Sequence, residues 1–143
     1  MKISTNGRYA LRMMIDLARN DQGGYIALRD VSGREEISPK YLEQIVTTLS
    51  RAGFLKSVRG AQGGYRLARE PKDYTVGEIL RATEGNLFPV SCLENEPAGC
   101  DRVEQCATFS FWVGLQEVID DYVDHVTLAD LAARSDPSAS CNQ

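Results

Sequence analysis

Residues 37–67 read ISPKYLEQIVTTLSRAGFLKSVRGAQGGYRL, and this stretch decides the fold. Ser38 followed by Pro39 predicts a helix start, because the serine oxygen can accept free backbone N–H groups and proline has no N–H to leave unpaired. Gly53 suits the left-handed residue that ends such a helix. Between these signals the apolar residues recur with helical spacing and predict one buried stripe: Leu42, Ile45, Val46 and Leu49.

The rest of this helix carries side chains that can reach base edges or phosphates: Lys40, Tyr41, Gln44, Thr47, Thr48 and Arg51. Two short strands are expected next, about Phe54 to Val58 and Tyr65 to Leu67, joined by the glycine-rich turn 59–64. A helix pair followed by a basic hairpin predicts a winged helix-turn-helix, whose second helix enters the DNA major groove. A generic α+β interaction domain is the alternative.

The flanking segments predict further helices. A first helix runs from a cap at residues 4–6 to the turn at 20–24, and a second lies around Leu28 to Glu35. Thr75 and Glu78 have the spacing of a capping box, in which the side chain of each residue accepts a hydrogen bond from the backbone N–H of the other. A fourth helix is therefore expected to begin there.

Residues 86–105 show no periodicity and are expected to form a loop. From Thr108 a long amphipathic helix follows, and a short last helix is expected over Leu128 to Ala133. The apolar positions of the long helix are Phe111, Trp112, Leu115, Val118, Ile119, Tyr122 and Val126. Its acidic positions, expected on the opposite face, are Glu117, Asp120, Asp121 and Asp124. The simplest partner for this apolar face is a second copy of the chain, and packing against its own domain is the alternative.

The predicted fold class is mainly α with a small β-wing, a winged helix-turn-helix plus a long dimerisation helix. Four segments follow from this reading. They are a DNA-binding domain over 1–85, a cysteine-containing loop over 86–107, the dimerisation helix with the short C-terminal helix over 108–134, and a tail over 135–143 expected to be disordered.

The net charge of −4 conceals an asymmetry along the chain. Residues 1–91 contain 14 basic and 10 acidic side chains, whereas residues 92–143 contain 2 and 10. Between Gln44 and Arg69 there is no acid but several basic residues. This is the pattern expected of a surface that meets phosphates, although a solvated basic face would look the same.

The composition also excludes several classes of protein. No run of apolar residues is long enough to span a membrane, and the first residues lack a secretion signal, so a cytoplasmic protein is expected. The chain has one histidine, no C-x-x-C pair and no glycine-rich nucleotide fingerprint. An enzyme, including a small thiol oxidoreductase, is therefore not expected.

Three cysteines lie close together in the sequence, at Cys92, Cys100 and Cys106. Their spacing differs from the C-x-x-C of zinc ribbons and thioredoxin-type redox pairs. Thiolates are the usual ligands of iron-sulfur clusters, and a loop can bring three of them to one site. The pattern fits a two-iron or a four-iron centre, while zinc and plain structural thiols are alternatives. Cys141, in the polar tail, is expected to be a bystander.

With these elements in place, the sequence resembles the Rrf2 family of transcription regulators over roughly residues 1–133. The resemblance rests on MKIS at 1–4, GRYA at 7–10, ISPKYLEQ at 37–44, VRG at 58–60 and GGY at 63–65. It implies a homodimer that binds double-stranded, pseudo-palindromic operator DNA and carries cluster ligands in the loop, with a 2Fe-2S cluster favoured over 4Fe-4S.

The resemblance also implies roles for single residues. Glu43 matches a position that tunes operator choice when the cluster is absent, and Arg59 with Gly60 at the wing matches a minor-groove contact. The helix residues that match major-groove or phosphate contacts are Ser38, Lys40, Tyr41 and Gln44, and Arg51 on the same helix is added as a DNA-binding candidate. Each could instead be an ordinary surface residue.

The sequence departs from the family pattern at the fourth cluster ligand. Phe109 stands where IscR-like members have a histidine, and Arg8 stands where NsrR-like members have an acid. His125 lies far along the long helix and is expected at the surface. The remaining candidates are Glu94, Glu96, Asp101, Glu104, Thr108, a water or a small thiol.

The leading functional expectation is a regulator that senses iron-sulfur cluster status and controls iron-sulfur biogenesis or related metal and sulfur genes. One alternative is a nitric-oxide-sensing repressor of the same fold. Another is a CymR-like regulator of cysteine metabolism, which leaves the three clustered cysteines unexplained. A regulator stabilised by zinc is the fourth reading.

Overall fold

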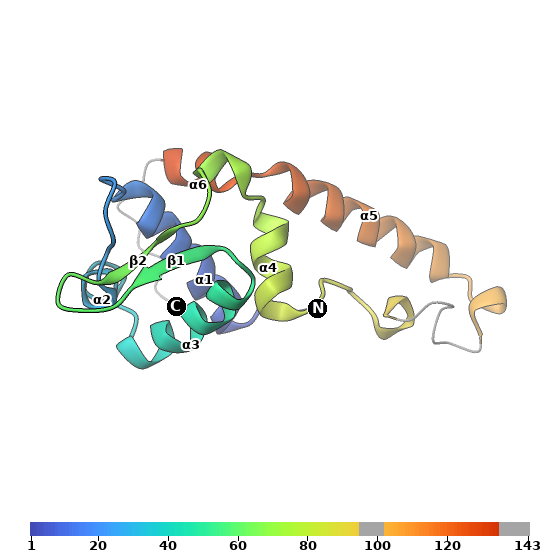
Figure 1. The fold of residues 1–143 in the computed structure, drawn as a ribbon. Helices are drawn as coiled ribbons and strands as arrows, with labels where there is room; N and C mark the ends of the chain where they lie inside the picture. The colour runs from blue at the N-terminus through green and yellow to red at the C-terminus, as the bar shows by residue number, and fades with distance from the viewer. Residues whose placement is uncertain (95–101, 135–143) are drawn as a thin grey trace.

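The computed structural model describes residues 1–94 and 102–134, and Figure 1 shows how its elements are arranged. The helices are α1 (Thr5–Arg19), α2 (Leu28–Glu35), α3 (Pro39–Arg51), α4 (Val76–Glu84), α5 (Phe109–His125) and α6 (Leu128–Ala133). The strands are β1 (Leu55–Val58) and β2 (Gly64–Leu67), and single 3₁₀ turns are η1 (Pro71–Asp73), η2 (Ser91–Leu93) and η3 (Val103–Gln105). The predicted class, mainly helical with a small two-stranded wing, is confirmed.

The core lies between α1, α3 and α4, with the base of the hairpin closing one side. The apolar stripe predicted for α3 is buried in full. Tyr74 is completely buried, and its hydroxyl donates to the Phe54 carbonyl at 2.7 Å. Burial raises the pKa of this hydroxyl, so the bond persists at any ordinary pH. Asp16, also buried, accepts two bonds from Arg34 and ties α2 to α1.

The helix ends follow the capping signals in the sequence. Ser38 accepts the N–H of Tyr41, and the capping box of Thr75 with Glu78 is present at the start of α4. Gly53 adopts a φ of 80° just past α3. The next N–H, that of Phe54, then bonds back into the last turn of α3, so the chain leaves the helix directly into β1.

The wing is an antiparallel hairpin in which Leu55 pairs with Leu67 and Val58 with Gly64. Both strands begin one residue away from the predicted positions. Ile26 and Tyr65 exchange two backbone bonds of 2.8 Å, so residue 26 extends the edge of the hairpin. A Cβ on Gly64 would overlap the Ile26 backbone, and only glycine allows this pairing.

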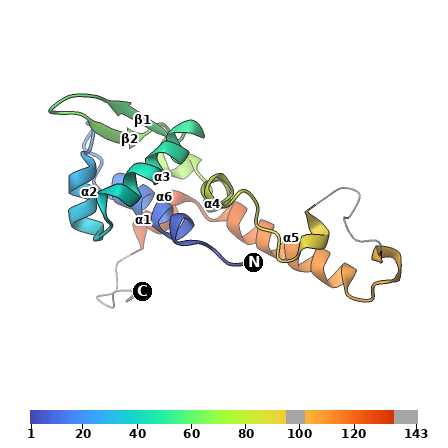
Figure 2. The same cartoon turned by 90° about the horizontal axis from the view of Figure 1, so that it is seen from below.

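Helix α5 projects from the winged domain as an arm, and Figures 1 and 2 show it from two sides. Along one side Ile119, Val123 and Val126 pack on α4 and Leu87. The prediction that α5 needs an apolar partner is therefore met in part by its own domain. Among the described residues, no helix is both long and apolar enough to cross a membrane.

Two acidic side chains of α5 lie beside its apolar contact with α4 rather than on the opposite face, which corrects the expectation. Arg81 of α4 pairs with Asp120 at 2.8 Å and with Asp124 at 2.6 Å. These pairs lie beside the apolar contact between α4 and α5. They fix the angle of the arm because one guanidinium bonds two carboxylates a helical turn apart.

Candidate nucleic-acid interface and cysteine segment

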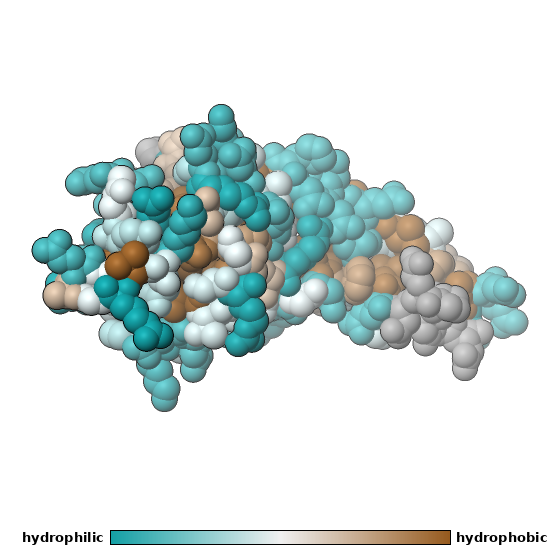
Figure 3. Space-filling view, in the orientation of Figure 1, coloured by the Kyte–Doolittle hydropathy of each residue, from teal (hydrophilic) through white to brown (hydrophobic). Residues whose placement is uncertain are grey.

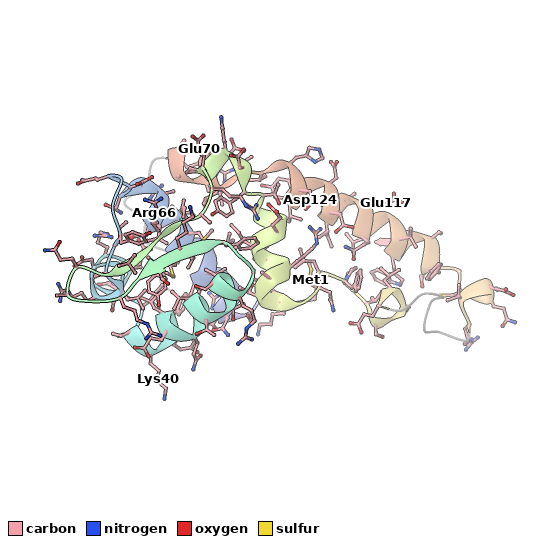
Figure 4. All side chains as sticks on the ribbon, in the orientation of Figure 1. Met1, Lys40, Arg66, Glu70, Glu117 and Asp124 are labelled. Carbon is pink, nitrogen blue, oxygen red and sulfur yellow. The ribbon has the colours of Figure 1, made fainter. Side chains whose placement is uncertain are left out.

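Helix α3 lies at an edge of the winged domain with one side in solvent. Figure 4 shows Lys40 extending away from the domain at the edge opposite Glu70. Five predicted DNA contacts are exposed here and form what we call the exposed α3 face: Ser38, Lys40, Tyr41, Gln44 and Arg51. On the same helix, the Thr47 hydroxyl donates a hydrogen bond to the Glu43 carbonyl at 2.9 Å, so the lone pairs of its oxygen point outward.

The other predicted contacts, Arg59 and Gly60, are exposed at the tip of the wing. Gly60 has a φ of 112°, a conformation that side chains disfavour. A Cβ on Gly63 would overlap the Val58 carbonyl oxygen, so the turn depends on glycine at both positions. The tight turn places Arg59 at the end of the hairpin with its charge in solvent.

The acid-free basic segment divides into two groups. Arg69 pairs with Glu78 at 3.2 Å and lies over the Phe54 and Tyr74 rings, while Arg66 lies 5.2 Å from the centre of the Tyr25 ring. The contacts of these two arginines therefore stabilise the fold. The other cations of this segment are Arg51, Lys56 and Arg59. All three are exposed, and within residues 1–94 and 102–134 they form neither an ion pair nor a ring contact.

Sequence reasoning missed two residues beside the exposed α3 face. Tyr9 of α1 meets Tyr41 edge-on, with ring centres 5.6 Å apart. Arg12 lies over the Tyr9 ring at 5.3 Å. Their spacing of three on α1, outside its buried stripe, was the available signal, but which helix they would face depends on tertiary packing.

The two described cysteines lie on the segments between α4 and α5. Cys92 is partly buried in η2, and Cys106 is exposed just before α5. Both segments lie at the end of the molecule away from the wing in Figures 1 and 2. Cys100 falls outside the described residues, so convergence of the three thiols remains a prediction.

The thiol of Cys106 has a lowered pKa and therefore ionises more readily than an ordinary cysteine. Its sulfur lies 3.2 Å from the Thr108 hydroxyl, and this bond is the main reason that the pKa of the thiol is lowered. The backbone N–H groups of Thr108 and Phe109, at the start of α5, and the charge of Arg102 act in the same direction. A thiolate is the form that ligates iron or zinc.

The fourth cluster ligand is not assigned by the described residues. Phe109 opens α5, while His125 lies at its other end, exposed, with Nδ1 2.6 Å from the Asp121 carbonyl. Glu94 and Glu104 are exposed, and Glu96 and Asp101 lie outside the described ranges. Within those ranges no three metal-binding side chains come together, but Cys100 is not among them. The thiol chemistry at Cys106 suits an iron-sulfur cluster.

A winged helix-turn-helix with an exposed basic second helix and wing defines the class of DNA-binding transcription regulators. The chain belongs to the Rrf2 family, described as "Iron-dependent Transcriptional regulator", which matches residues 3–134. The expectation that it is a regulator rather than an enzyme is confirmed.

Relatives in this family include two kinds of regulator. The HTH-type transcriptional regulator CymR of Bacillus subtilis is 40% identical, over 95% of this chain and 93% of that protein. The HTH-type transcriptional regulator IscR of Serratia proteamaculans is 35% identical, over 95% and 82%.

Two solved structures show the same arrangement of elements. That of CymR, described as the global cysteine regulator of B. subtilis, superposes with a TM-score of 0.79 at 38% identity, covering 95% of this chain and 99% of that one. That of T. potens IscR superposes with a TM-score of 0.72 at 36% identity, covering 96% and 94%.

Proposed function

We propose that the chain is a cytoplasmic, homodimeric regulator that binds an iron-sulfur cluster and changes its operator binding with cluster status. Cys92, Cys100 and Cys106 would hold the cluster, 2Fe-2S rather than 4Fe-4S. The observation that carries the proposal is the exposed Cys106 thiol, which the Thr108 hydroxyl and the start of α5 hold toward its thiolate form. Its targets would be genes for iron-sulfur biogenesis or related metal and sulfur functions.

The cysteine segment suits a sensor because its donors are accessible. Cys106 is exposed and Cys92 only partly buried, so oxidants, nitric oxide and iron chelators can reach the sulfur atoms. A cluster bound there would supply a reversible, oxidant-sensitive group with at most one ligand outside the three thiolates. Residues 86–107 would form the sensing segment and residues 1–85 the DNA-binding domain. Residues 108–134 would supply the dimerisation helix and the short C-terminal helix, which packs on α1.

DNA would be read by the exposed α3 face and the wing. Lys40, Gln44 and Tyr41 project from the first turns of α3, the part of a recognition helix that meets base edges. Ser38 and Arg51 lie at the two ends of the helix, where phosphates of opposite strands would be contacted. Arg59, next to Gly60, would enter the minor groove.

A chain of contacts connects the cysteine segment with the DNA-binding helices. Glu84, the last residue of α4, accepts bonds from the Ser4 N–H at 2.9 Å and the Ser4 hydroxyl at 2.6 Å. The Met1 ammonium group lies 3.4 Å from the Pro89 carbonyl. A displacement of the segment after α4 would therefore pull on the start of α1, which packs on α3.

The iron and acid-labile sulfide content of anaerobically purified protein tests the cluster directly. We expect a coloured wild type that contains both, a Cys92→Ala variant that has lost the colour, and a Cys141→Ala variant that keeps it. A colourless wild type that resists reconstitution, or that binds zinc in stoichiometric amount, would contradict the cluster proposal.

The second candidate function is control of cysteine metabolism, as in CymR. The 40% identity to CymR over nearly the whole chain favours it. In that case wild type and a variant with all three cysteines changed to alanine would bind operator DNA equally, and no iron would be recovered.

A further inference from the structure

Two side chains of α1 touch both helices of the helix-turn-helix. Tyr9 contacts the Tyr41 ring edge-on, with an angle of 81° between the ring planes. Arg12 lies over the Tyr9 ring and also pairs with the Glu35 carboxylate at 3.3 Å. A second Arg12 nitrogen donates to the Glu35 carbonyl. Glu35 ends α2 and Tyr41 lies in the first turn of α3, so the pair spans the turn between them.

That turn is short and conformationally unusual. Glu36 has a φ of 55°, the only non-glycine residue with positive φ among the described residues. Ser38 then caps α3. A three-residue link with one left-handed residue leaves the orientation of α3 sensitive to the contacts on either side of it.

The Tyr41 side chain is 41% exposed, so one part of its ring faces solvent while its neighbour Tyr9 holds another. Aromatic pairs and cation–π contacts favour particular ring orientations. Without Tyr9, the Tyr41 side chain would gain rotamer freedom that must be lost again when it meets DNA.

We propose that Tyr9 and Arg12 are positioning residues for operator recognition. They hold the Tyr41 ring and the turn between α2 and α3 in the orientation presented to DNA, and they act through Tyr41 rather than by their own contacts with bases. This inference rests on the proposed DNA-binding role of the exposed α3 face.

The test uses the full-length protein in its cluster-loaded form and two duplexes. One is the sequence that wild type selects from a randomised pool, and the other is an unrelated sequence of equal length. We expect Tyr9→Leu to lower the ratio of specific to non-specific affinity about five-fold, because an oriented aromatic contact is lost. The dependence of affinity on salt should stay as in wild type, because no phosphate contact is removed.

The conservative variant separates positioning from direct contact. Tyr9→Phe keeps the ring but lacks the hydroxyl, and we expect its affinity ratio to stay within about two-fold of wild type. A loss as large as that of Tyr9→Leu would mean that the hydroxyl itself contacts DNA, and would overturn the proposal. An unchanged ratio in Tyr9→Leu would also overturn it.

A double-mutant cycle with Tyr41→Leu tests the route. If Tyr9 acts through Tyr41, adding Tyr9→Leu to Tyr41→Leu should cause little further loss, whereas independent residues give additive losses. If Tyr41→Leu alone changes nothing, the DNA-binding role proposed for the exposed α3 face fails first. Arg12→Gln, followed together with thermal unfolding, provides the same test if Tyr9→Leu does not fold, and an unchanged ratio in this variant would again overturn the proposal.

Discussion

Arg59 owes its place at the wing tip to the glycines beside it. Because Gly60 takes a positive φ and Gly63 has no room for a side chain, the turn stays tight and the arginine projects beyond the strands. The resemblance to the Rrf2 family identified Arg59 as a candidate DNA contact at the wing. The sequence alone could not show that Arg66 would lie over the Tyr25 ring. Nor could it show that Arg69 would pair with Glu78.

Replacing Arg59 should therefore weaken DNA binding in a salt-dependent way. In Arg59→Ala we expect the slope of log affinity against log salt concentration to fall by roughly 1, because one cation that displaces counterions is gone. Lys72→Ala is the matched control, since Lys72 pairs with Glu70 on the side away from Lys40. Fluorescence anisotropy over a salt series measures both, and equal slopes in the two variants would refute the assignment.

The Cys106 thiol gives a pH-dependent prediction. Its lowered pKa means that, at a given pH, a larger fraction of this thiol is the reactive thiolate than for an ordinary cysteine. In cluster-free protein with the other cysteines changed to serine, Thr108→Val should shift the alkylation-rate profile to higher pH, because the principal hydrogen bond to the sulfur is removed. Ser110→Ala, in the same turn, should leave the profile in place. If the protein with Thr108→Val and the same protein with Thr108 retained gave identical profiles, the Thr108 hydroxyl would have no effect on the pKa of the thiol.

Helices and wing were predictable where a local signal exists. Ser38 with Pro39, the capping box of Thr75, and Gly53 each act within a few residues, so sequence alone located both ends of α3 and the start of α4. Contacts made across long sequence separations were not predictable. Arg81 lies about forty residues from its partner carboxylates on α5, and no periodicity in either helix specifies that they meet.

The joint between α4 and α5 depends on the absence of a side chain at Gly77. A Cβ there would overlap the Asp124 carboxylate and crowd Val123 and Arg81. We expect Gly77→Ala to lower the free energy of unfolding by about 1 kcal/mol, since the Asp124 and Arg81 side chains would have to leave their ion pair and Val123 would have to shift.

Gly33→Ala supplies the matched control for this joint. Gly33 lies within α2 and has nothing within 4 Å of an added Cβ, so alanine there should raise stability by up to about 1 kcal/mol through helix propensity. Urea denaturation of both variants measures the difference. A Gly77→Ala protein as stable as Gly33→Ala would mean that α5 is not held tightly on α4.

At the scale of the whole molecule, the arm leaves apolar side chains uncovered. Phe111, Val118 and Tyr122 are 54%, 66% and 65% exposed, and they follow the seven- and four-residue spacing of a helix that packs on another helix. Figure 3 shows apolar surface along the arm as brown patches. The sequence predicted this face, but it could not show that Ile119 and Val126 would turn toward the chain's own α4.

The proposed dimer can be tested on this face. Val118→Lys should shift the protein to monomer in sedimentation velocity and weaken binding to a two-half-site duplex, because a charge would replace apolar contact between the two copies. Asp121→Lys is the control, since it changes charge on an exposed part of the same helix. A Val118→Lys protein that remains dimeric would place the interface elsewhere.

Among the residues that the structure describes, the cysteine segment is joined to the winged domain through α4, α5 and the N-terminal residues. The central claim is that cluster status reaches α3. The most direct test is the operator affinity of one preparation of wild type before and after cluster removal under anaerobic conditions, beside a variant with Cys92, Cys100 and Cys106 changed to alanine. We predict that cluster removal changes the affinity or the preferred operator and that the alanine variant matches the cluster-free protein. Equal binding by all three forms on every operator would contradict the claim.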